Sequence, residues 1–277
     1  MPTAEQPDTD QPATPTPLRD AATVVLVRDS PNGIEVFLQR RVKQMAFAGG
    51  MTVFPGGGVD PRDADASLDW TGPQPQWWAG QFATDSDVAQ ALVCAAVRET
   101  FEECGVLLAT DADGVFADPA ALGDDRTRLV DKSISFAEFL RTRGLTLRAD
   151  LLAPLAHWIT PKNEKRRYDT RFFVASMPDG QVADDDTTEA EVAQWMTAAQ
   201  ALELWTSGKH FLLPPTWSQL DEISRHRTVA ELMAVTRTVT PIEPEVSVGA
   251  GLRGLFFPDA ERYFAGLGEH AIPDITR

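Results

Sequence analysis

Alternating apolar and polar positions near the start of the chain predict a β-hairpin. Two β-branched runs, 22–28 and 34–40, flank the turn-like segment Ser-Pro-Asn-Gly at 30–33. A short apolar stretch at 51–54 then leads into one proline and three glycines at 55–58. Because glycine has no side chain to pack, we expect these glycines to form a loop rather than a strand, with a backbone that approaches a ligand closely.

Helical spacing of apolar residues predicts a main helix over 87–103. Asp87 is a suitable N-cap, Gln90 completes a capping box, and Gly105 fits a C-terminal stop. Strands and helices then alternate irregularly, which predicts an α/β (α+β) fold with a mixed sandwich rather than a doubly wound sheet. The remaining expected elements are strands at 151–159 and 171–176, a solvated acidic loop at 182–191, and helices at 136–143, 197–205 and 217–235.

Composition divides the chain into a tail, a domain and an extension. Residues 1–18 are rich in Pro, Thr, Asp and Gln and lack a basic start, so we expect a disordered tail and not a signal peptide. Residues 19–210 form the predicted domain, with an insertion at about 61–86 pinned by aromatic contacts rather than by regular structure. Residues 211–277 form a C-terminal helical extension. Its Pro- and Gly-rich part after Thr240 is expected on the surface or in the contact of a homodimer.

The acidic composition excludes several function classes. The net charge is -16 at pH 7, which disfavours binding to nucleic acid and to anionic membranes. Cys94 and Cys104 are the only cysteines and form no C-x-x-C pair, so neither a zinc site nor a disulfide framework is indicated. No apolar run reaches the ~20 residues of a membrane span. Together these features predict a cytoplasmic protein.

Three glutamates on the main helix are the strongest chemical signal. Glu99, Glu102 and Glu103 are related by i, i+3 and i+4, so they share one helix face. Oxygen-only ligands suit a hard cation, Mg²⁺ or Mn²⁺. Arg98 reaches Glu102 one turn later and holds it in place. Three glutamates alone are better explained by a solvated helix face than by a cation site. A solvated face requires neither Arg98, nor Gly105, nor the upstream glycines, so their presence favours the cation site.

With these residues the stretch resembles the nudix box, G-x5-E-x7-R-E-U-x-E-E-x-G-U, in which U is aliphatic. The first half begins at Gly57, and the insertion at about 61–86 interrupts the box. The first-half glutamate falls on Asp63 or Gln90, and Thr100 replaces an aliphatic residue. The resemblance covers roughly 21–205. The second half matches at Arg98, Glu99, Glu102, Glu103, Gly105 and Val106.

The resemblance implies a nudix-type α/β/α sandwich with a mixed sheet, and Mg²⁺-dependent hydrolysis of a diphosphate linkage in a small nucleotide derivative. Glu102 and Glu103 would ligate the cation together with the Gly57 carbonyl. Glu99 would be a further ligand or the general base, and Arg98 would orient Glu99 or Glu102. Nudix enzymes often recruit another, distant carboxylate. The candidates here are Glu164, Glu189 and Glu191.

A second resemblance concerns the substrate. The register of Arg41, Gly50 and 54–57 is similar to the signature of nudix coenzyme A diphosphatases, although Val42 and Ala46 depart from it. The interrupted box and the segments 158–161 and 167–173 resemble the peroxisomal coenzyme A diphosphatase subgroup. Coenzyme A or acyl-coenzyme A is therefore the leading substrate. The phosphate-contact candidates are Arg40, Arg41, Arg166 and Arg167.

Two alternatives stay open from the sequence. One is a broader nucleoside-diphosphate-X hydrolase acting on NADH, ADP-ribose or a damaged nucleotide, and the other is a non-catalytic nudix-like binding module. The intact glutamates argue against the second. If Glu103 is exposed, Glu103→Gln should remove nearly all turnover and leave the fold intact.

Overall fold

The computed structural model describes residues 16–42, 50–65, 67–162, 164–184, 190–247 and 251–267. The expected disordered tail lies almost entirely outside these ranges. Its last residue, Leu18, already belongs to the first strand.

A mixed central sheet forms the middle layer of the molecule. Its strands run in the order β10-β2-β1-β9-β8-β11, with β3 paired to β2 and β4 paired to β1. β1 and β9 are parallel, whereas β1–β2 and β8–β9 are antiparallel. The predicted hairpin and both predicted strands are confirmed. The strands are β1 (Leu18–Ser30), β2 (Gly33–Arg41), β3 (Thr52–Val53), β4 (Gly56–Gly58), β8 (Leu152–Ile159), β9 (Arg167–Ser176), β10 (Ala190–Thr197) and β11 (Pro241–Ile242).

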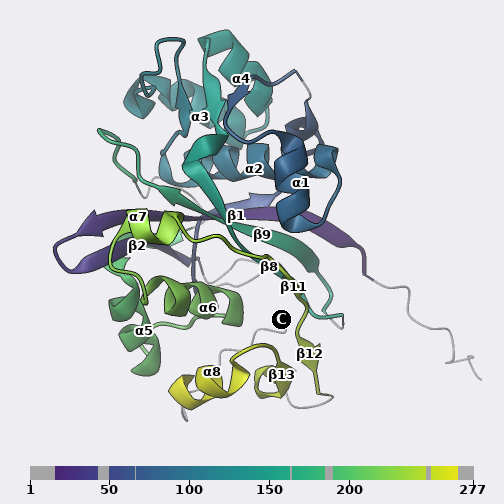
Figure 1. Cartoon of the computed structure of the whole chain (residues 1–277), viewed down its shortest axis with the longest axis vertical. Coiled ribbons are helices and arrows are strands. Elements are labelled where there is room, and N and C mark those ends of the chain that lie inside the picture. Colours follow the sequence, from purple (N-terminus) through teal and green to yellow (C-terminus); the bar gives the residue numbers. More distant parts are fainter. Residues whose placement is uncertain are drawn as a thin grey trace, which may run out of the picture.

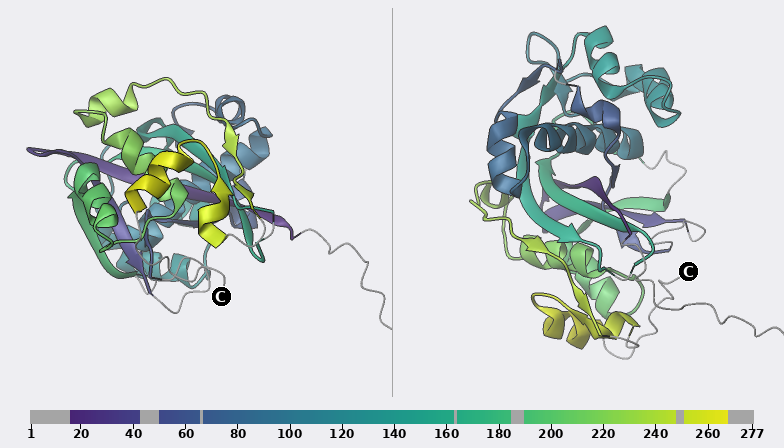
Figure 2. Two further views of the ribbon diagram at one scale, coloured as in Figure 1. Left: turned by 90° about the horizontal axis from the view of Figure 1, so that it is seen from below. Right: turned by 90° about the vertical axis from the view of Figure 1, so that its right-hand side faces the viewer.

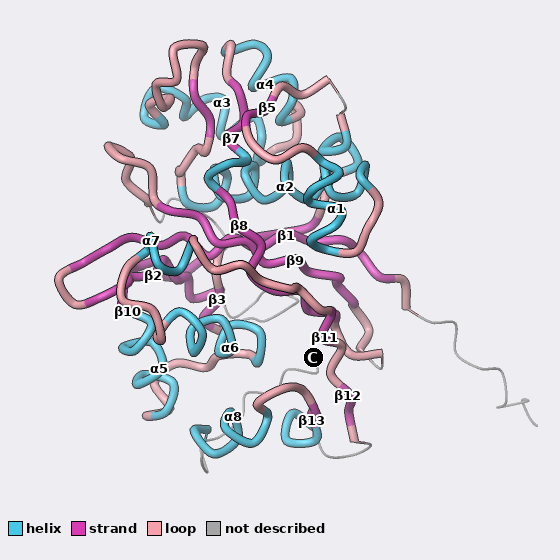
Figure 3. The backbone as a smooth tube through the Cα atoms, viewed as in Figure 1, coloured by secondary structure: helices cyan, strands magenta, loops and turns pink. Residues whose placement is uncertain are grey.

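Helices cover both faces of this sheet, so the predicted α/β/α sandwich is confirmed (Figures 1 and 3). One face carries α1 (Pro75–Phe82), α2 (Ser86–Cys104), α3 (Gly123–Val130) and α4 (Phe136–Arg143). The other carries α5 (Ala198–Thr206), α6 (Pro214–Ile223), α7 (Val229–Met233) and α8 (Ala260–Leu267). Two small sheets lie outside the central one. They contain β5 (Trp70–Thr71), β6 (Ala109–Thr110) and β7 (Thr146–Arg148), and the hairpin of β12 (Glu245–Val246) and β13 (Leu255–Phe256).

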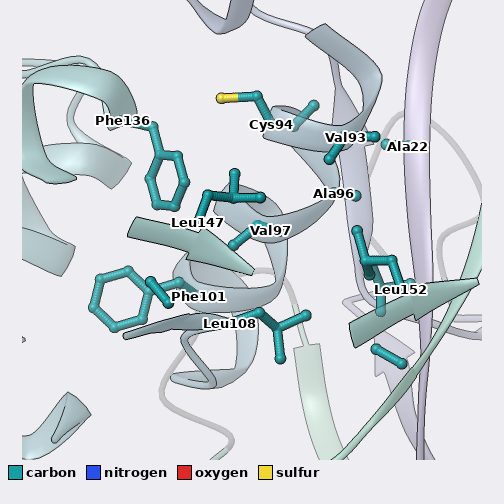
Figure 4. Close-up of a cluster of buried hydrophobic side chains, with 14 of the residues drawn as sticks. Ala22, Val93, Cys94, Ala96, Val97, Phe101, Leu108, Phe136, Leu147 and Leu152 are labelled. Atoms are coloured by element: carbon teal, nitrogen blue, oxygen red, sulfur yellow. The ribbon is translucent and has the colours of Figure 1, made fainter. Parts of the chain in front are cut away.

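Alternation along β1 supplies both hydrophobic cores. Ala22, Val24 and Leu26 pack toward α2, and Val25 and Val27 pack toward the other helical layer. This is the two-residue period of a strand buried on both faces. Figure 4 shows the first core, in which the apolar side of α2 meets β1 and β8. The second core lies between the sheet and the layer of α5 to α8, so it supports the sheet against which α2 packs.

The three glycines at 56–58 form strand β4, which corrects the predicted loop. β4 pairs with residues 21–23 of β1. A Cβ atom at Gly56 would lie 2.5 Å from the carbonyl oxygen of Ala22. The missing side chain therefore permits this close pairing instead of preventing it.

The insertion contains regular structure, contrary to prediction, because α1 and the 3₁₀ helix η1 (Pro61–Ala64) lie within it. The expected aromatic contacts are present. Trp78 is fully buried, stacks on Phe82 with ring centroids 6.2 Å apart, and touches Phe173 of β9. Aromatic packing thus fixes the insertion to the sheet.

The predicted capping box of α2 is wrong. The helix begins at Ser86 with Asp85 as its N-cap. Gln90 instead donates to the carbonyl of Asp65 at 2.8 Å. Gly105 ends the helix in a left-handed conformation, φ 67°, as predicted.

The C-terminal extension has no separate core. The predicted helix at 217–235 is split into α6 and α7, and β11 joins the sheet beside β8. The segment after Thr240 was expected on the surface or in a homodimer contact. Its Tyr263 is instead fully buried and donates to the carbonyl of Leu212 at 2.8 Å. In the part of the chain that the structure describes, no helix has the length and apolarity needed to cross a membrane.

Candidate active site

A buried arginine organises the acidic end of α2. Nε and Nη2 of Arg98 donate to the Asp63 carboxylate at 3.0 and 2.9 Å. Nη1 of Arg98 donates to Glu99 at 2.8 Å and to Glu102 at 3.3 Å. Asp63 is only 2% exposed. Of the two residues considered for the first-half position of the box, Asp63 therefore reaches the arginine, whereas Gln90 does not.

Glu103 points toward the glycine strand. One of its carboxylate oxygens accepts a hydrogen bond from the backbone N–H of Gly56 at 2.9 Å. The residue is 6% exposed, so the expectation of an exposed Glu103 is wrong. Pairing of β4 with β1 holds the Gly56 amide where this hydrogen bond forms.

β4 approaches α2 closely at two further points. The carbonyl of Gly58 accepts from Nη2 of Arg98 at 3.0 Å. A Cβ atom on Gly57 would lie 2.5 Å from a carboxylate oxygen of Glu99. The glycines and the glutamates that the sequence pattern linked are thus neighbours in space.

The last four carbonyls of α2 lack partners within the helix, as in any helix, and each has a donor here. Gly105 N–H donates to Phe101 and the Gln39 side chain to Glu103. The other two donors are Arg126 Nε, to Glu102 at 3.1 Å, and Asp184 N–H, to Cys104 at 3.0 Å. Distant segments therefore fix the turn that carries the glutamates.

Arg126 and Asp184 also form a bidentate ion pair, with distances of 2.8 and 2.9 Å. Asp184 lies in a loop, as predicted, and its side chain is 42% exposed even though it pairs with Arg126. Gln39, Arg126 and Asp184 had no signal in the sequence, since each meets α2 only through the tertiary fold.

The acidic end of α2 holds more negative charge than its arginine offsets. The pKa of Glu99 is raised to about 7 mainly by burial, which Arg98 opposes and the neighbouring Glu102 carboxylate reinforces. Burial likewise raises the pKa of Glu102. A cation placed here would favour the ionised carboxylates that burial disfavours.

Within the described ranges, no three His, Cys, Asp or Glu side chains are already gathered as a metal cage. The three carboxylates are instead turned toward other donors. Nη1 of Arg98 donates to Glu99 and Glu102, and the Gly56 amide donates to Glu103. The donor set itself fits a hard cation, since it offers carboxylate oxygens only. Rotation of these side chains would be needed to converge on one ion.

A cleft with a volume of about 1880 Å³ opens beside the acidic helix end. Its lining comes from α2, from α6 and from the β12–β13 hairpin. The ribbon shows α2 on one side of the central sheet and the other two on the opposite side (Figure 2). Glu99, Glu102 and Glu103 line it together with 56–58. This volume exceeds the roughly 300–1,000 Å³ of ordinary ligand pockets.

Two of the four candidate phosphate-contact arginines line this cleft, namely Arg41 and Arg166. Arg40 instead pairs with Glu191 at 3.4 Å, outside the lining. Arg167 is buried and pairs with Glu243 at 2.5 Å. Neither Arg40 nor Arg167 is among the residues that line the cleft, so the cleft geometry does not support their assignment as substrate contacts.

Among the three candidates for the distant carboxylate, Glu164 alone lines the cleft in the described part of the chain. Glu191 is engaged by Arg40. Glu189 lies outside the described residues.

Both the sequence and the fold of this chain are similar to those of known proteins. The sequence model described as the NUDT19 Nudix domain matches residues 77–226. A solved NUDIX hydrolase from Alicyclobacillus acidocaldarius is 30% identical, with a TM-score of 0.69 over 80% of this chain and 98% of that one.

Curated relatives named acyl-coenzyme A diphosphatase NUDT19 are similar over a shorter share. The Xenopus laevis protein is 24% identical over 74% of this chain and 63% of its own length. The Homo sapiens protein is 27% identical over 72% of this chain and 63% of its own length. The chain thus spans less than two thirds of these relatives. The family match covers more than half of the chain and includes the acidic helix, so this chain belongs to the nudix hydrolase family described by the NUDT19 Nudix domain.

Proposed function

We propose that this chain hydrolyses the diphosphate linkage of coenzyme A or acyl-coenzyme A with the aid of a divalent cation, Mg²⁺ or Mn²⁺. The observation that carries the proposal is the acidic end of α2, held against β4 at the mouth of a large cleft. The names of the NUDT19 relatives support the substrate class.

The chain's own groups have separable roles in this chemistry. Glu102 and Glu103 would hold the cation together with the Gly57 carbonyl, and Glu99 would join them or take the proton of the attacking water. A bound divalent cation supplies positive charge that offsets the diphosphate and makes water a better nucleophile. Arg98 keeps Glu99 and Glu102 oriented.

Basic residues on the cleft wall would draw in the anionic substrate against the overall negative charge. Arg41, Lys165 and Arg166 line the same cleft as the acidic end of α2. Their guanidinium and ammonium groups suit phosphate oxygens. Such local charge is needed, because the net charge of -16 repels polyanions.

A substrate panel tests the assignment. Purified protein with Mg²⁺ or Mn²⁺ should release 3′,5′-ADP from coenzyme A, and turnover should stop when EDTA is added. NADH and ADP-ribose should be cut more slowly. Faster cleavage of either one would favour the broader nucleoside-diphosphate-X hydrolase. No turnover of any diphosphate, with metal bound, would favour the binding module.

Gly57 provides a test of the close approach between β4 and α2. Gly57→Ala should lower kcat/KM by roughly a hundredfold, because the new methyl group displaces the Glu99 carboxylate. Gly58→Ala is the matched control, since a methyl group there meets no atom within 4 Å. Equal activity of the two variants would contradict a site built on this contact.

The remaining sequence-based expectations stay predictions. We propose a small-molecule substrate without nucleic-acid or membrane partners, consistent with the acidic composition. The cytoplasmic location is supported by two cysteines that are both unpaired and buried. A homodimer is tested by light scattering of the purified chain.

A further inference from the structure

The cleft changes chemical character along its length. Beside α2 its lining is charged, whereas at the C-terminal extension it becomes apolar. Five residues form this apolar wall, namely Leu213, Pro214, Val246, Leu252 and Leu255. The part formed by Val246, Leu252 and Leu255 lies beyond the segment 77–226 that the family model matches.

The β12–β13 hairpin presents a definite face to the cleft. Val246 and Leu255 are a cross-strand pair, and both line the cleft. The neighbouring pair, Glu245 and Phe256, lines a separate pocket on the other side of the hairpin. Successive residues of a strand point to opposite faces. One face of this hairpin is therefore committed to the cleft.

Several contacts fix the apolar wall in place. Ser247 N–H donates to the Gly254 carbonyl at 2.9 Å, which closes the hairpin. Phe257, which follows β13, packs edge-on against Trp158 of β8 with ring centroids 5.7 Å apart. The ion pair of Arg167 with Glu243 ties the segment before β12 to β9. The wall is thus preformed, and Arg167 supports it instead of binding phosphate.

We propose that the apolar wall binds the acyl chain of an acyl-thioester substrate. This inference rests on the proposed function and names the part of the cleft that selects among its substrates. Trp158 and Phe172 of the sheet also line the cleft, although only 3% and 6% of their surfaces are exposed. A diphosphate or ribose gains nothing from such a lining, whereas each methylene group buried there raises affinity roughly fourfold. The volume of the cleft leaves room for a chain beside the nucleotide.

The experiment compares two coenzyme A substrates that differ only in the chain. The kcat/KM values of decanoyl-coenzyme A and of free coenzyme A are measured with Mg²⁺ for wild type, Val246→Asn and Leu255→Asn. Each variant should lower the ratio of kcat/KM for decanoyl-coenzyme A to kcat/KM for free coenzyme A by about tenfold or more, because a polar group then faces the acyl chain. Binding of decanoyl-coenzyme A without metal, measured by calorimetry, should weaken in parallel.

Phe256→Asn is the matched control, as it changes the same strand on the opposite face and should leave the ratio unchanged. Both cleft-facing residues are half-buried, and thermal melts show whether each variant is folded. If either folded variant loses activity on both substrates equally, the wall contacts the part common to both and the acyl assignment is overturned. An unchanged ratio in both variants overturns it as well. Failure of the wild type to cleave either substrate, while it cuts another diphosphate, overturns the proposed function and this inference together.

Discussion

Glu102→Gln and Glu103→Gln should each lower kcat/KM for the cleaved diphosphate by about three orders of magnitude. Each change removes one negative charge from the oxygens that would hold the cation. The contribution of a metal ion to transition-state charge stabilisation is several kcal/mol, and each 1.36 kcal/mol corresponds to a factor of ten. Because the replacement is isosteric, the loss should come from charge and not from packing.

The stability of Glu103→Gln decides how this result is interpreted. Glu103 is buried and accepts from the Gly56 amide, so the charge-assisted hydrogen bond is weakened. A glutamine oxygen still accepts that bond, and we expect a cost of about 1 kcal/mol in unfolding free energy. Urea unfolding followed by circular dichroism measures this cost beside the kinetics.

Glu203→Gln provides the control, since Glu203 is an exposed glutamate on α5, across the sheet from α2. It should change neither turnover nor stability. Binding of Mn²⁺, followed by electron paramagnetic resonance, should weaken in the two α2 variants only. Full activity of a folded Glu102→Gln or Glu103→Gln protein would remove these residues from the site.

The sequence predicted the parts of the site that lie close together along the chain. Arg98, Glu99, Glu102 and Glu103 sit within two turns of one helix, so helical spacing alone placed them on one side. Gly57 was linked to them by the resemblance, and the structure brings its backbone against Glu99. A mixed α/β sandwich followed from the alternation of strands and helices along the chain, whereas the α/β/α layering was implied by the resemblance.

Long-range contacts could not be predicted in this way. Gln39 and Arg126 meet the end of α2 only after the sheet and α3 have packed. The charge of Arg167 suggested a phosphate contact, but its partner Glu243 lies far along the chain. The sequence shows that Arg167 is charged but not that Glu243 lies next to it, so the burial of this ion pair was not predicted.

Other strands were missed because their sequences carry no clear strand pattern. Val246 and Leu255 lie in strands of two residues, which are too short to show a period. β10 follows the acidic run near Asp184, whose composition favoured a loop. β4 consists of glycines, which are rare in strands, and its pairing depends on the partner strand β1.

Arg98→Met should produce the largest loss of stability, about 3–5 kcal/mol in the free energy of unfolding. Asp63 is 2% exposed and would keep a buried carboxylate without its bidentate partner. Removing one member of a buried ion pair costs this much because the remaining charge is uncompensated. For a chain of this size the melting temperature should fall by roughly 5–15 °C.

Asp63→Asn should cost less than Arg98→Met, since Arg98 retains Glu99 and Glu102 as partners. The double variant should regain part of the loss, because an asparagine beside methionine leaves no orphaned charge at this position. Arg225→Met is the surface control and should cost under about 1 kcal/mol, as its partner Asp221 keeps Arg262. Urea unfolding of the four proteins of this cycle and the control gives the coupling energy directly. A coupling near zero would contradict this prediction, because the costs of losing Arg98 and of losing the Asp63 charge would then be independent of each other.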